Sequence, residues 1–197
     1  THIAINLHFK SHIIRDYFGD GRRWGVEISY SDEPHLLGTA GGVKKMETFF
    51  SSEPDFLIQY GDIVTDQDLS ALVNYHRQHG ALATLLLHRR ARSNSVVSLD
   101  AEGRIIDFLE RPTEEVRHKA TSPWVNSGIC IATPALLEKI PPGKPCDLPC
   151  DIFPGLVPSR RLFGFPLTGF RCAVDSPARR EELTAAIDRD PRLASAW

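Results

Sequence analysis

The sequence lacks the features that mark several specialised classes of protein. Its 197 residues carry a net charge of −2 and include no long run of residues of like charge. A protein that binds nucleic acid through a basic patch needs such a concentration of positive charge. The chain also lacks a run of about 18 apolar residues, which a membrane-spanning helix requires. We therefore expect neither nucleic acid nor a membrane among its partners.

Cysteine is sparse as well. The four cysteines are Cys130, Cys146, Cys150 and Cys172, and no segment has the pattern of a secretory leader. Cys146 and Cys150 are loosely spaced and no second pair of ligands accompanies them, so a zinc site is not expected. This usage of cysteine predicts reduced thiols and a cytoplasmic protein.

What the chain does contain suits one compact domain over residues 1–197. Hydrophobic residues make up 42% of the sequence and charged residues 24%, a balance that allows a sizeable core. The chain starts at Thr1 without a methionine and enters a strand-like segment almost at once. We expect that an N-terminal segment of the protein is missing from this sequence.

Strand-like and helix-like segments alternate along the chain. Strands are predicted at residues 2–7, 24–31, 55–62, 81–89 and 124–133, with a hairpin over 96–112 and extended chain over 162–174. Helices are predicted at 10–18, from about 43 to 50, at 68–79, at 134–140, at 147–159 with a proline interruption, and at 176–190. The last helix is expected to start at Ser176 and Pro177, a favoured cap and first helical residue. This order predicts an α/β domain with a mixed sheet, mostly parallel at first and rich in hairpins later.

Asp62 follows directly after a predicted buried strand, with Gly61 before it. In open α/β sheets, ligands bind at the carboxyl ends of the strands. A carboxylate at this point is well placed to hold Mg²⁺ against a bound phosphate. The same residue can equally cap a turn, and the residues alone leave both roles open.

Asp66 and Asp68 lie just before the next predicted helix. An N-cap residue and an acidic residue in the first turn are expected there from helix capping and the helix dipole alone.

The stretch LLGTAGG, residues 36–42, predicts a tight turn before a helix that starts at about Val43. Free N–H groups at such a helix start can meet an anion or the edge of a nucleotide. The spacing of Gly38, Gly41 and Gly42 does not match the glycine fingerprint of dinucleotide-binding proteins.

Five blocks of sequence occur in the order and spacing of the sugar-nucleotide pyrophosphorylases. The blocks are PHLLGTAGGV, YGDIVTDQDLSALVNYH, GRIIDFLERP, WVNSGICIATPALLEKIP, and DIFPGL followed by LFGFPLTGF. The chain resembles these nucleotidyltransferases over essentially its whole length, and it resembles in particular the mannose-1-phosphate and heptose-1-phosphate guanylyltransferases.

The resemblance implies a Rossmann-like, three-layer α/β/α fold with a mixed, mostly parallel sheet. It implies a reaction in which a nucleoside triphosphate, GTP in preference, joins a sugar 1-phosphate and releases pyrophosphate. Mg²⁺ and basic side chains would offset the charge that develops on the phosphates. The family resemblance is also compatible with a homodimer.

The resemblance further implies roles for individual residues. Asp62 and Arg111 would be catalytic, with Arg111 at a position where the family often has lysine. Asp62 would bind Mg²⁺, and Asp175 is the candidate for a second metal ligand. The nucleotide would contact Gly38, Thr39, Ala40 and Gly41, and the sugar would contact Glu110, Asn126 and Gly128.

The chain departs from the family pattern in three places. It has no N-terminal glycine-rich loop with Arg and Lys, which in the family binds the triphosphate. Ala173 stands where the family commonly has a second metal-binding Asp, two residues before Asp175. Asn94 and Ser95 stand where members often have Tyr-Gly, which suggests a narrower sugar pocket.

These departures leave two alternatives open. Ala173 favours a non-catalytic relative that still binds a sugar nucleotide. The sequence Asp66-Gln67-Asp68 can be matched to the metal-binding D-x-D of a GT-A-type glycosyltransferase.

Overall fold

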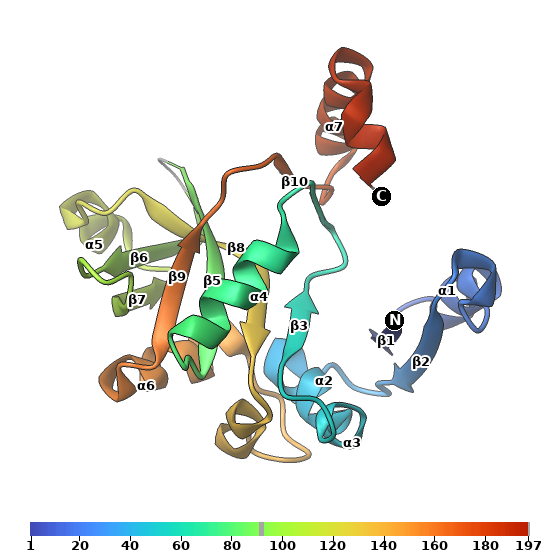
Figure 1. The fold of residues 1–197 in the computed structure, drawn as a ribbon, viewed down its shortest axis with the longest axis horizontal. Helices are drawn as coiled ribbons and strands as arrows, with labels where there is room; N and C mark the ends of the chain where they lie inside the picture. The colour runs from blue at the N-terminus through green and yellow to red at the C-terminus, as the bar shows by residue number, and fades with distance from the viewer. Residues whose placement is uncertain (91–92, 197) are drawn as a thin grey trace. The chain divides into compact units, whose positions relative to one another are not determined.

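A computed structural model describes residues 1–90 and 93–196 of the chain. The chain divides into two compact units (Figure 1). The first unit contains residues 1–55 and 134–155, and the second contains residues 56–133 and 156–197. The expected single domain over residues 1–197 stays a prediction.

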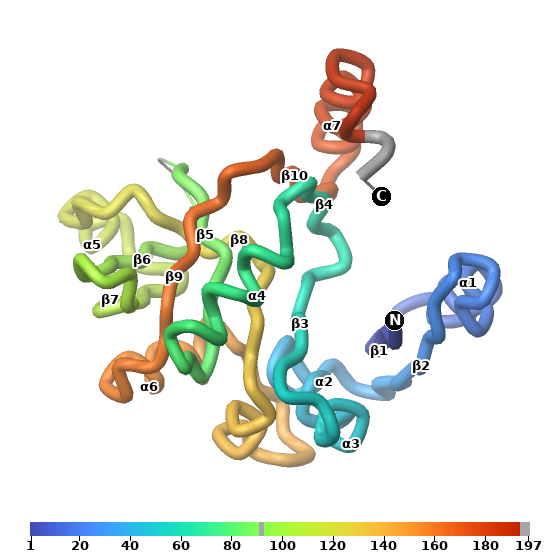
Figure 2. Tube along the Cα trace, in the orientation of Figure 1, coloured from blue at the N-terminus to red at the C-terminus, as the bar shows by residue number. Residues whose placement is uncertain are grey.

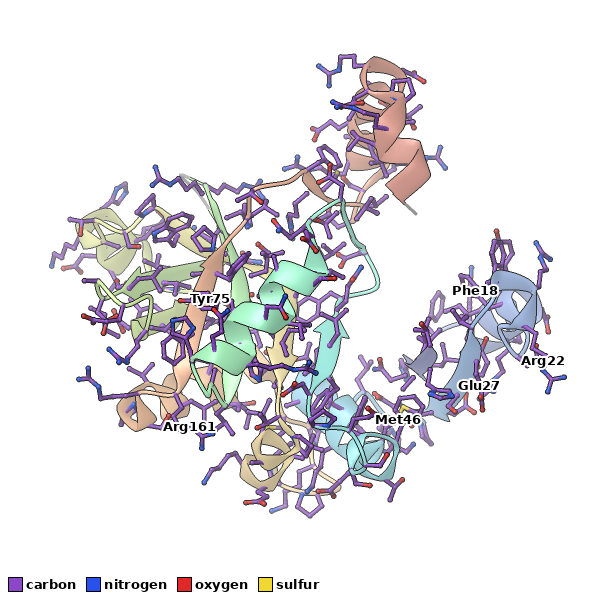
Figure 3. All side chains as sticks on the ribbon, in the orientation of Figure 1. Phe18, Arg22, Glu27, Met46, Tyr75 and Arg161 are labelled. Atoms are coloured by element: carbon purple, nitrogen blue, oxygen red, sulfur yellow. The ribbon has the colours of Figure 1, made fainter. Side chains whose placement is uncertain are left out.

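The first unit begins with a parallel pair of strands joined by a helix, as the sequence predicts. Strand β1 (His2–Leu7) pairs with β2 (Glu27–Asp32), and α1 (Ser11–Phe18) lies between them in the chain. A 3₁₀ turn, η1 (Arg22–Trp24), leads into β2. Helix α1 has no buried residue, and its side chains project from the ribbon around Phe18 (Figure 3).

The helix after β2 begins earlier than predicted. It starts at Gly38 rather than at about Val43, as α2 (Gly38–Lys45), and is followed by α3 (Glu47–Phe50). Glycine has poor helix propensity, so local sequence argues against this start. Hydrogen bonds from a distant segment, described below, provide the stabilisation that the local sequence does not.

Short helical turns follow one another over residues 134–159, of which residues 134–155 belong to the first unit. Residues predicted as the short helix 134–140 form a 3₁₀ helix, η2 (Pro134–Lys139). The helix predicted over 147–159 is split into a π-helix, η3 (Leu148–Ile152), then α6 (Phe153–Leu156) and a 3₁₀ turn, η4 (Val157–Ser159). The prediction that prolines interrupt this segment is confirmed.

The second unit is built on a six-stranded mixed sheet. Five strands follow the order β7-β6-β8-β5-β9. Strand β3 pairs with β8 along the edge that faces away from β5. The strands are β3 (Phe56–Gln59), β5 (Ala83–Arg89), β6 (Ser95–Leu99), β7 (Ile105–Glu110), β8 (Trp124–Ala132) and β9 (Leu162–Pro166).

The mixed character of the sheet is confirmed, but the expected predominance of parallel pairing is not. Within this sheet only β5 and β9 pair in parallel, whereas the other described pairs are antiparallel. The reason lies in β8, which runs opposite to its neighbours and separates β3 from β5. Strands β3 and β5, which run in the same direction, therefore do not pair with each other.

Helix α4 (Leu69–Gln78) packs on this sheet (Figure 1). Its Leu72 joins a buried cluster with Ile63, Leu86, Ile129 and Ile131. Burying each such side chain contributes about 1.5–3 kcal/mol to the free energy of folding. On the same helix, Tyr75 packs edge-on against Phe165 of β9, with ring centroids 5.2 Å apart (Figure 3).

The second unit also contains a separate pair of short strands. Strand β4 (Ile63–Thr65) pairs with β10 (Arg171–Ala173) in an antiparallel ladder (Figure 2). Helix α7 (Pro177–Arg189) follows, and the Ser176 hydroxyl accepts a hydrogen bond from the backbone N–H of Arg179 as predicted. The last 3₁₀ turn is η5 (Pro191–Ala196).

One of the described α-helices was not predicted. Helix α5 (Glu114–Lys119) is short, polar and capped by the Thr113 hydroxyl, so it carries no apolar periodicity. Over residues 1–90 and 93–196, no helix is both long and apolar enough to span a lipid bilayer.

Candidate active site

The predicted nucleotide-binding turn lies in the first unit and is held by its own protein neighbours. The N–H groups of Ala40 and Gly41 both donate to the Cys146 carbonyl oxygen, each at 3.0 Å. The Cys146 N–H in turn donates to the Leu37 carbonyl oxygen at 2.8 Å. These N–H groups, expected to be free for a ligand, are therefore engaged by residues 146–148, which we call the clamp segment.

Thr39 and Gly38 are tied to the same clamp segment. The Thr39 hydroxyl oxygen accepts a hydrogen bond from the Leu148 N–H at 2.7 Å. Gly38 has φ +73, and a Cβ at this position would lie 2.5 Å from the Cys146 carbonyl oxygen. A glycine is therefore required by both the backbone conformation and the close approach.

A buried carboxylate, missed by the sequence reasoning, supports the turn from its other side. Glu33 is 3% exposed, and its two oxygens accept hydrogen bonds from the Asn6 side chain and from the Leu37 N–H, each at 3.0 Å. Leu37 is the N-cap of α2 and has no capping side chain of its own, and the bond from its N–H to Glu33 fixes the backbone at the start of the helix. Nucleotide contact by residues 38–41 stays a prediction.

In the second unit, three polar residues lie in one row across neighbouring strands. Ser95 of β6 pairs with Glu110 of β7, and the Ser95 hydroxyl accepts a hydrogen bond from the Asn126 N–H at 2.8 Å. We call Glu110, Ser95 and Asn126 the polar row. The structure thus places Glu110 and Asn126, the two residues expected to bind sugar hydroxyls, each next to Ser95.

The side-chain amide of Asn126 is fixed through its oxygen, which leaves its Nδ2 group available to a ligand. Its Oδ1 accepts a hydrogen bond from the Gly128 N–H at 3.1 Å. Among the described residues no acceptor meets its Nδ2 group, and the residue is only half-buried. An amide N–H₂ group in this state can donate to a hydroxyl of a ligand.

Gly128 is needed for packing within the protein. Its φ is +81, and a Cβ there would lie 3.0 Å from Cδ2 of the Tyr60 ring and 3.2 Å from Ile63. The space beside its Cα is therefore filled by Tyr60, where the sequence reasoning expected a sugar. Its sugar-binding role stays a prediction.

Asp62 lies near this row and exposes its carboxylate. The Tyr60 N–H donates to the Gly128 carbonyl oxygen at 3.0 Å, and the Asp62 carbonyl oxygen accepts from the Val174 N–H at 2.7 Å. These two bonds fix the chain on either side of Asp62. The Asp62 carboxylate is exposed and accepts no hydrogen bond from the part of the chain that the structure describes.

Asp66 and Asp68 are engaged with the backbone. The Asp68 carboxylate caps α4 by accepting from the N–H of Ser70 at 2.8 Å, as predicted. The Asp66 carboxylate accepts from the Phe170 N–H. Both residues of the D-x-D pattern therefore have structural partners, unlike Asp62.

Arg111 follows the polar row directly. Its φ is +48, in the left-handed region that residues other than glycine adopt infrequently, and its side chain is exposed. Its N–H donates to the Asn94 carbonyl oxygen at 2.5 Å, which fixes the turn after β7. Such a backbone conformation at a loop beside a polar row is a common property of functional positions.

The residues around Asp62 offer few ligands for a metal. Ala173, at the position of the second expected carboxylate, packs against the apolar cluster around Leu72. Asp175 is exposed two residues later. No group of three or more His, Cys, Asp or Glu side chains that could hold a metal occurs in the described part of the chain. These residues fit a Mg²⁺ site in which one or two carboxylates bind the ion, and in which substrate phosphates and water complete its coordination.

The sequence reasoning also missed a basic cluster beside Asp62. Arg171 donates from Nε and Nη2 to the Ser127 carbonyl oxygen at 3.2 and 3.0 Å. The Ser127 hydroxyl lies 3.0 Å from His88 Nδ1. Burial, Arg171 and Arg90 lower the pKa of His88 to about 4, so this imidazole is neutral at pH 7. No local pattern signals this cluster, because its members come from three different strands.

Comparison with known proteins was made against a family model, curated sequences and solved structures. Residues 1–157 match the family model described as Nucleotidyl transferase. The chain is 37% identical over 171 residues to a UTP–glucose-1-phosphate uridylyltransferase of Synechocystis, covering 80% of this chain and 43% of that protein. It is 33% identical over 156 residues to the mannose-1-phosphate guanylyltransferase catalytic subunit beta of Drosophila pseudoobscura pseudoobscura, covering 78% and 40%.

The chain thus spans less than half the length of these two curated relatives. Among solved structures, HddC from Yersinia pseudotuberculosis superposes with a TM-score of 0.77 at 15% identity, covering 94% of this chain and 78% of that one. This likeness confirms the predicted Rossmann-like α/β fold with an open mixed sheet. Together with the family match over most of the sequence, it leads to one conclusion: the chain belongs to the nucleotidyl transferase family.

Proposed function

We propose that the protein joins a nucleoside triphosphate to a sugar 1-phosphate and releases pyrophosphate. The observation that carries the proposal is the exposed Asp62 carboxylate, unpartnered among the described residues, beside the polar row of Glu110, Ser95 and Asn126. Membership of the nucleotidyl transferase family supports the reaction class.

In the proposed reaction, an oxygen of the sugar phosphate attacks the α-phosphorus of the triphosphate. The bond to the bridging oxygen breaks, and pyrophosphate leaves with the electron pair. Asn126 would donate to a sugar hydroxyl and Glu110 would accept from one, which orients the attacking phosphate. Arg111 would offset phosphate charge, although its planar fork differs in shape from a lysine ammonium.

Mg²⁺ is the proposed cofactor, with Asp62 as its protein ligand and Asp175 as a second candidate. When bound, the ion would neutralise charge on the phosphate oxygens. The residues of the chain would position the two substrates without forming a covalent intermediate.

GTP is proposed as the preferred nucleotide and a mannose-type or heptose-type sugar 1-phosphate as the acceptor. A guanylyltransferase among the relatives supports this choice, and the uridylyltransferase makes UTP the competing candidate. Cys130, Cys146 and Cys172 are free thiols, which supports the proposal of a reducing, cytoplasmic setting. A homodimer is compatible with this function and is part of the proposal.

The experiment that tests the function measures pyrophosphate release by the full-length protein. GTP, UTP and dTTP are each paired with mannose 1-phosphate and glucose 1-phosphate at saturating Mg²⁺. The highest kcat/KM is expected for GTP with mannose 1-phosphate, and a higher value for UTP with glucose 1-phosphate would move the nucleotide assignment to UTP. Tight nucleotide-sugar binding without any turnover would support a non-catalytic relative, the alternative that Ala173 favours.

Turnover of a finished nucleotide sugar onto an acceptor, without pyrophosphate release, would support a glycosyltransferase instead. The structural roles of Asp66 and Asp68 argue against that outcome, because each carboxylate already accepts a hydrogen bond from the backbone.

A further inference from the structure

Ser127 lies where the ladder of β8 is interrupted. In the pairing of β5 with β8, Leu85 pairs with Cys130 and Leu87 with Asn126, so three β8 residues lie opposite a single residue of β5. Ser127 belongs to this bulge and also lies outside the pairing of β3 with β8. Its carbonyl oxygen therefore needs a partner other than a neighbouring strand, since a buried, unpaired carbonyl is costly.

Arg171 supplies that partner and is fixed by it. Ser127 is 0% exposed, and its carbonyl oxygen accepts from both Nε and Nη2 of Arg171. Two donors on one oxygen set both the position and the orientation of the guanidinium plane. Within the described residues, Nη1 of Arg171 has no hydrogen-bond partner, and the side chain is only half-buried.

The charge of Arg171 is not balanced by an ion pair. No described carboxylate lies within ion-pair distance of Arg171 or Arg90, although other arginines of the chain have such partners. The nearby imidazole of His88 is neutral and hydrogen-bonded to Ser127. Burial lowers the pKa of Arg171, while the negative charge of Asp62 acts in the opposite direction. A half-buried guanidinium without a paired anion is held at an energetic cost, and a bound anion would remove that cost.

We propose that Arg171 forms a phosphate-binding subsite beside Asp62. The ligand is a phosphate group, carried either by the sugar 1-phosphate or by pyrophosphate. The unused donors of the anchored guanidinium face a ligand that has several acceptor oxygens, which is the geometry that arginine recognises best. The inference rests on the proposed function only for the identity of the molecule that carries the phosphate.

The position beside Asp62 gives the subsite a distinctive signature. A cation near a metal-binding carboxylate strengthens the binding of phosphate and weakens the binding of a divalent ion. Removal of the Arg171 charge should therefore shift the two affinities in opposite directions. Simple damage to the fold would weaken both.

The test measures pyrophosphate binding to the full-length protein by isothermal titration calorimetry in the presence of EDTA. Arg171→Gln is expected to raise the Kd for pyrophosphate about 10-fold or more, because a charge-assisted contact is lost. Mannose 1-phosphate is titrated in a second arm, and the ligand that loses more affinity identifies the owner of the phosphate. Mn²⁺ binding, followed by electron paramagnetic resonance, is expected to stay equal or become tighter in the same variant.

Arg161→Gln is the matched control. Arg161, at the start of β9 (Figure 3), also donates from Nε to a carbonyl oxygen, that of Gly80, at 3.2 Å. Its replacement removes the same charge and should leave both phosphate affinities unchanged. Arg171→Lys keeps the charge without the fork and should show an intermediate loss.

Unchanged binding of both phosphates by Arg171→Gln, or an equal loss in Arg161→Gln, would overturn the proposal. If melting curves show that Arg171→Gln is unfolded, Arg171→Lys decides, and unchanged phosphate affinity in that variant overturns the subsite. The protein could bind phosphate in a way that depends on Arg171 and yet release no pyrophosphate from any triphosphate. That result would overturn the proposed function and support the subsite. Normal pyrophosphate release, together with unchanged phosphate affinity in Arg171→Gln, would overturn the subsite and leave the proposed function unaffected.

Discussion

The glycine turn of the first unit and the polar row of the second differ in how far the protein has used their hydrogen-bonding groups. In the turn, the N–H groups of Ala40 and Gly41 and the hydroxyl of Thr39 are all bonded to the clamp segment. Near the row, the Asp62 carboxylate and the Asn126 Nδ2 group meet no partner within the described chain.

A ligand site can be built from polar groups that are already bonded within the protein or from polar groups that are still unbonded. A turn whose polar groups are internally bonded acts on a ligand through its fixed shape, so mutations there should change stability first. Side chains with unused donors and acceptors act through direct contact, so mutations there should change rate or affinity with little effect on stability. Four predictions test this contrast.

The largest effect is expected for Gly38→Ala. A methyl group would lie 2.5 Å from the Cys146 carbonyl oxygen, on a backbone with φ +73. The combined strain and clash should lower the free energy of unfolding by about 3 kcal/mol. Chemical denaturation measures it. Gly80→Ala is the control, because Gly80 also has a positive φ but an added Cβ meets nothing within 4 Å. Equal losses in the two variants would show that the clamp segment adds no steric constraint.

Asp62→Asn should act in the opposite way, on rate rather than on stability. Loss of the carboxylate charge should reduce kcat at saturating Mg²⁺ by about 10²-fold, which corresponds to about 2.7 kcal/mol, with the melting temperature nearly unchanged. Asp68→Asn is the control, since asparagine also caps helices well and should preserve activity. A dead Asp68→Asn beside an active Asp62→Asn would transfer the metal site to the D-x-D pattern.

The pH dependence of stability should reveal His88. Its pKa in the folded protein is about 4, below the ordinary value of 6.5, so between these values the unfolded chain binds more protons than the folded one. Stability should therefore fall as the pH drops from 6.5 to 5, by about 1–2 kcal/mol once solvent screening of this half-buried group is allowed for. His88→Gln should flatten this part of the profile. A profile of equal slope in both proteins would show that His88 is not kept neutral by burial and by the arginines.

The smallest effect is expected for Thr39→Val, which removes the acceptor of the Leu148 N–H. The loss of one hydrogen bond should lower the unfolding free energy by about 1 kcal/mol. Thr39→Ser keeps the hydroxyl and should recover most of it. A large rise in the KM for the nucleotide, with no change in stability, would instead place the Thr39 hydroxyl on the ligand and break the contrast between the two regions.

Much of the fold followed from local sequence. The strands β5 and β8 carry nearly continuous apolar residues, and the start of α7 is specified by Ser176 and Pro177 within four residues of sequence. Asp68 was likewise identified as a helix cap from its neighbours. Where the determinants of an element are adjacent in the chain, periodicity and capping suffice to predict it.

The remaining features depend on partners that are distant in the chain. The first turn of α2 is rich in glycine, and its start depends on the Cys146 carbonyl, so propensity placed the helix start too late. The basic cluster depends on the pairing of β10 with β4 and on a bulge in β8, neither of which local sequence specifies. The site residues carried over from the family were found by the order of motifs, whereas Arg171 lies just outside the matching blocks and Ser127, although inside one of them, had no expected role.

The clamp segment also has a consequence for the order in which the protein matures. Thr39 and its partner Leu148 are 109 residues apart, so the glycine turn cannot reach its final form until the clamp segment has been synthesised. At translation rates of about 5–20 residues per second, the turn waits on the order of 5–20 seconds on the ribosome. During that interval the N–H groups of Ala40 and Gly41 lack the Cys146 carbonyl oxygen that accepts their hydrogen bonds in the folded protein.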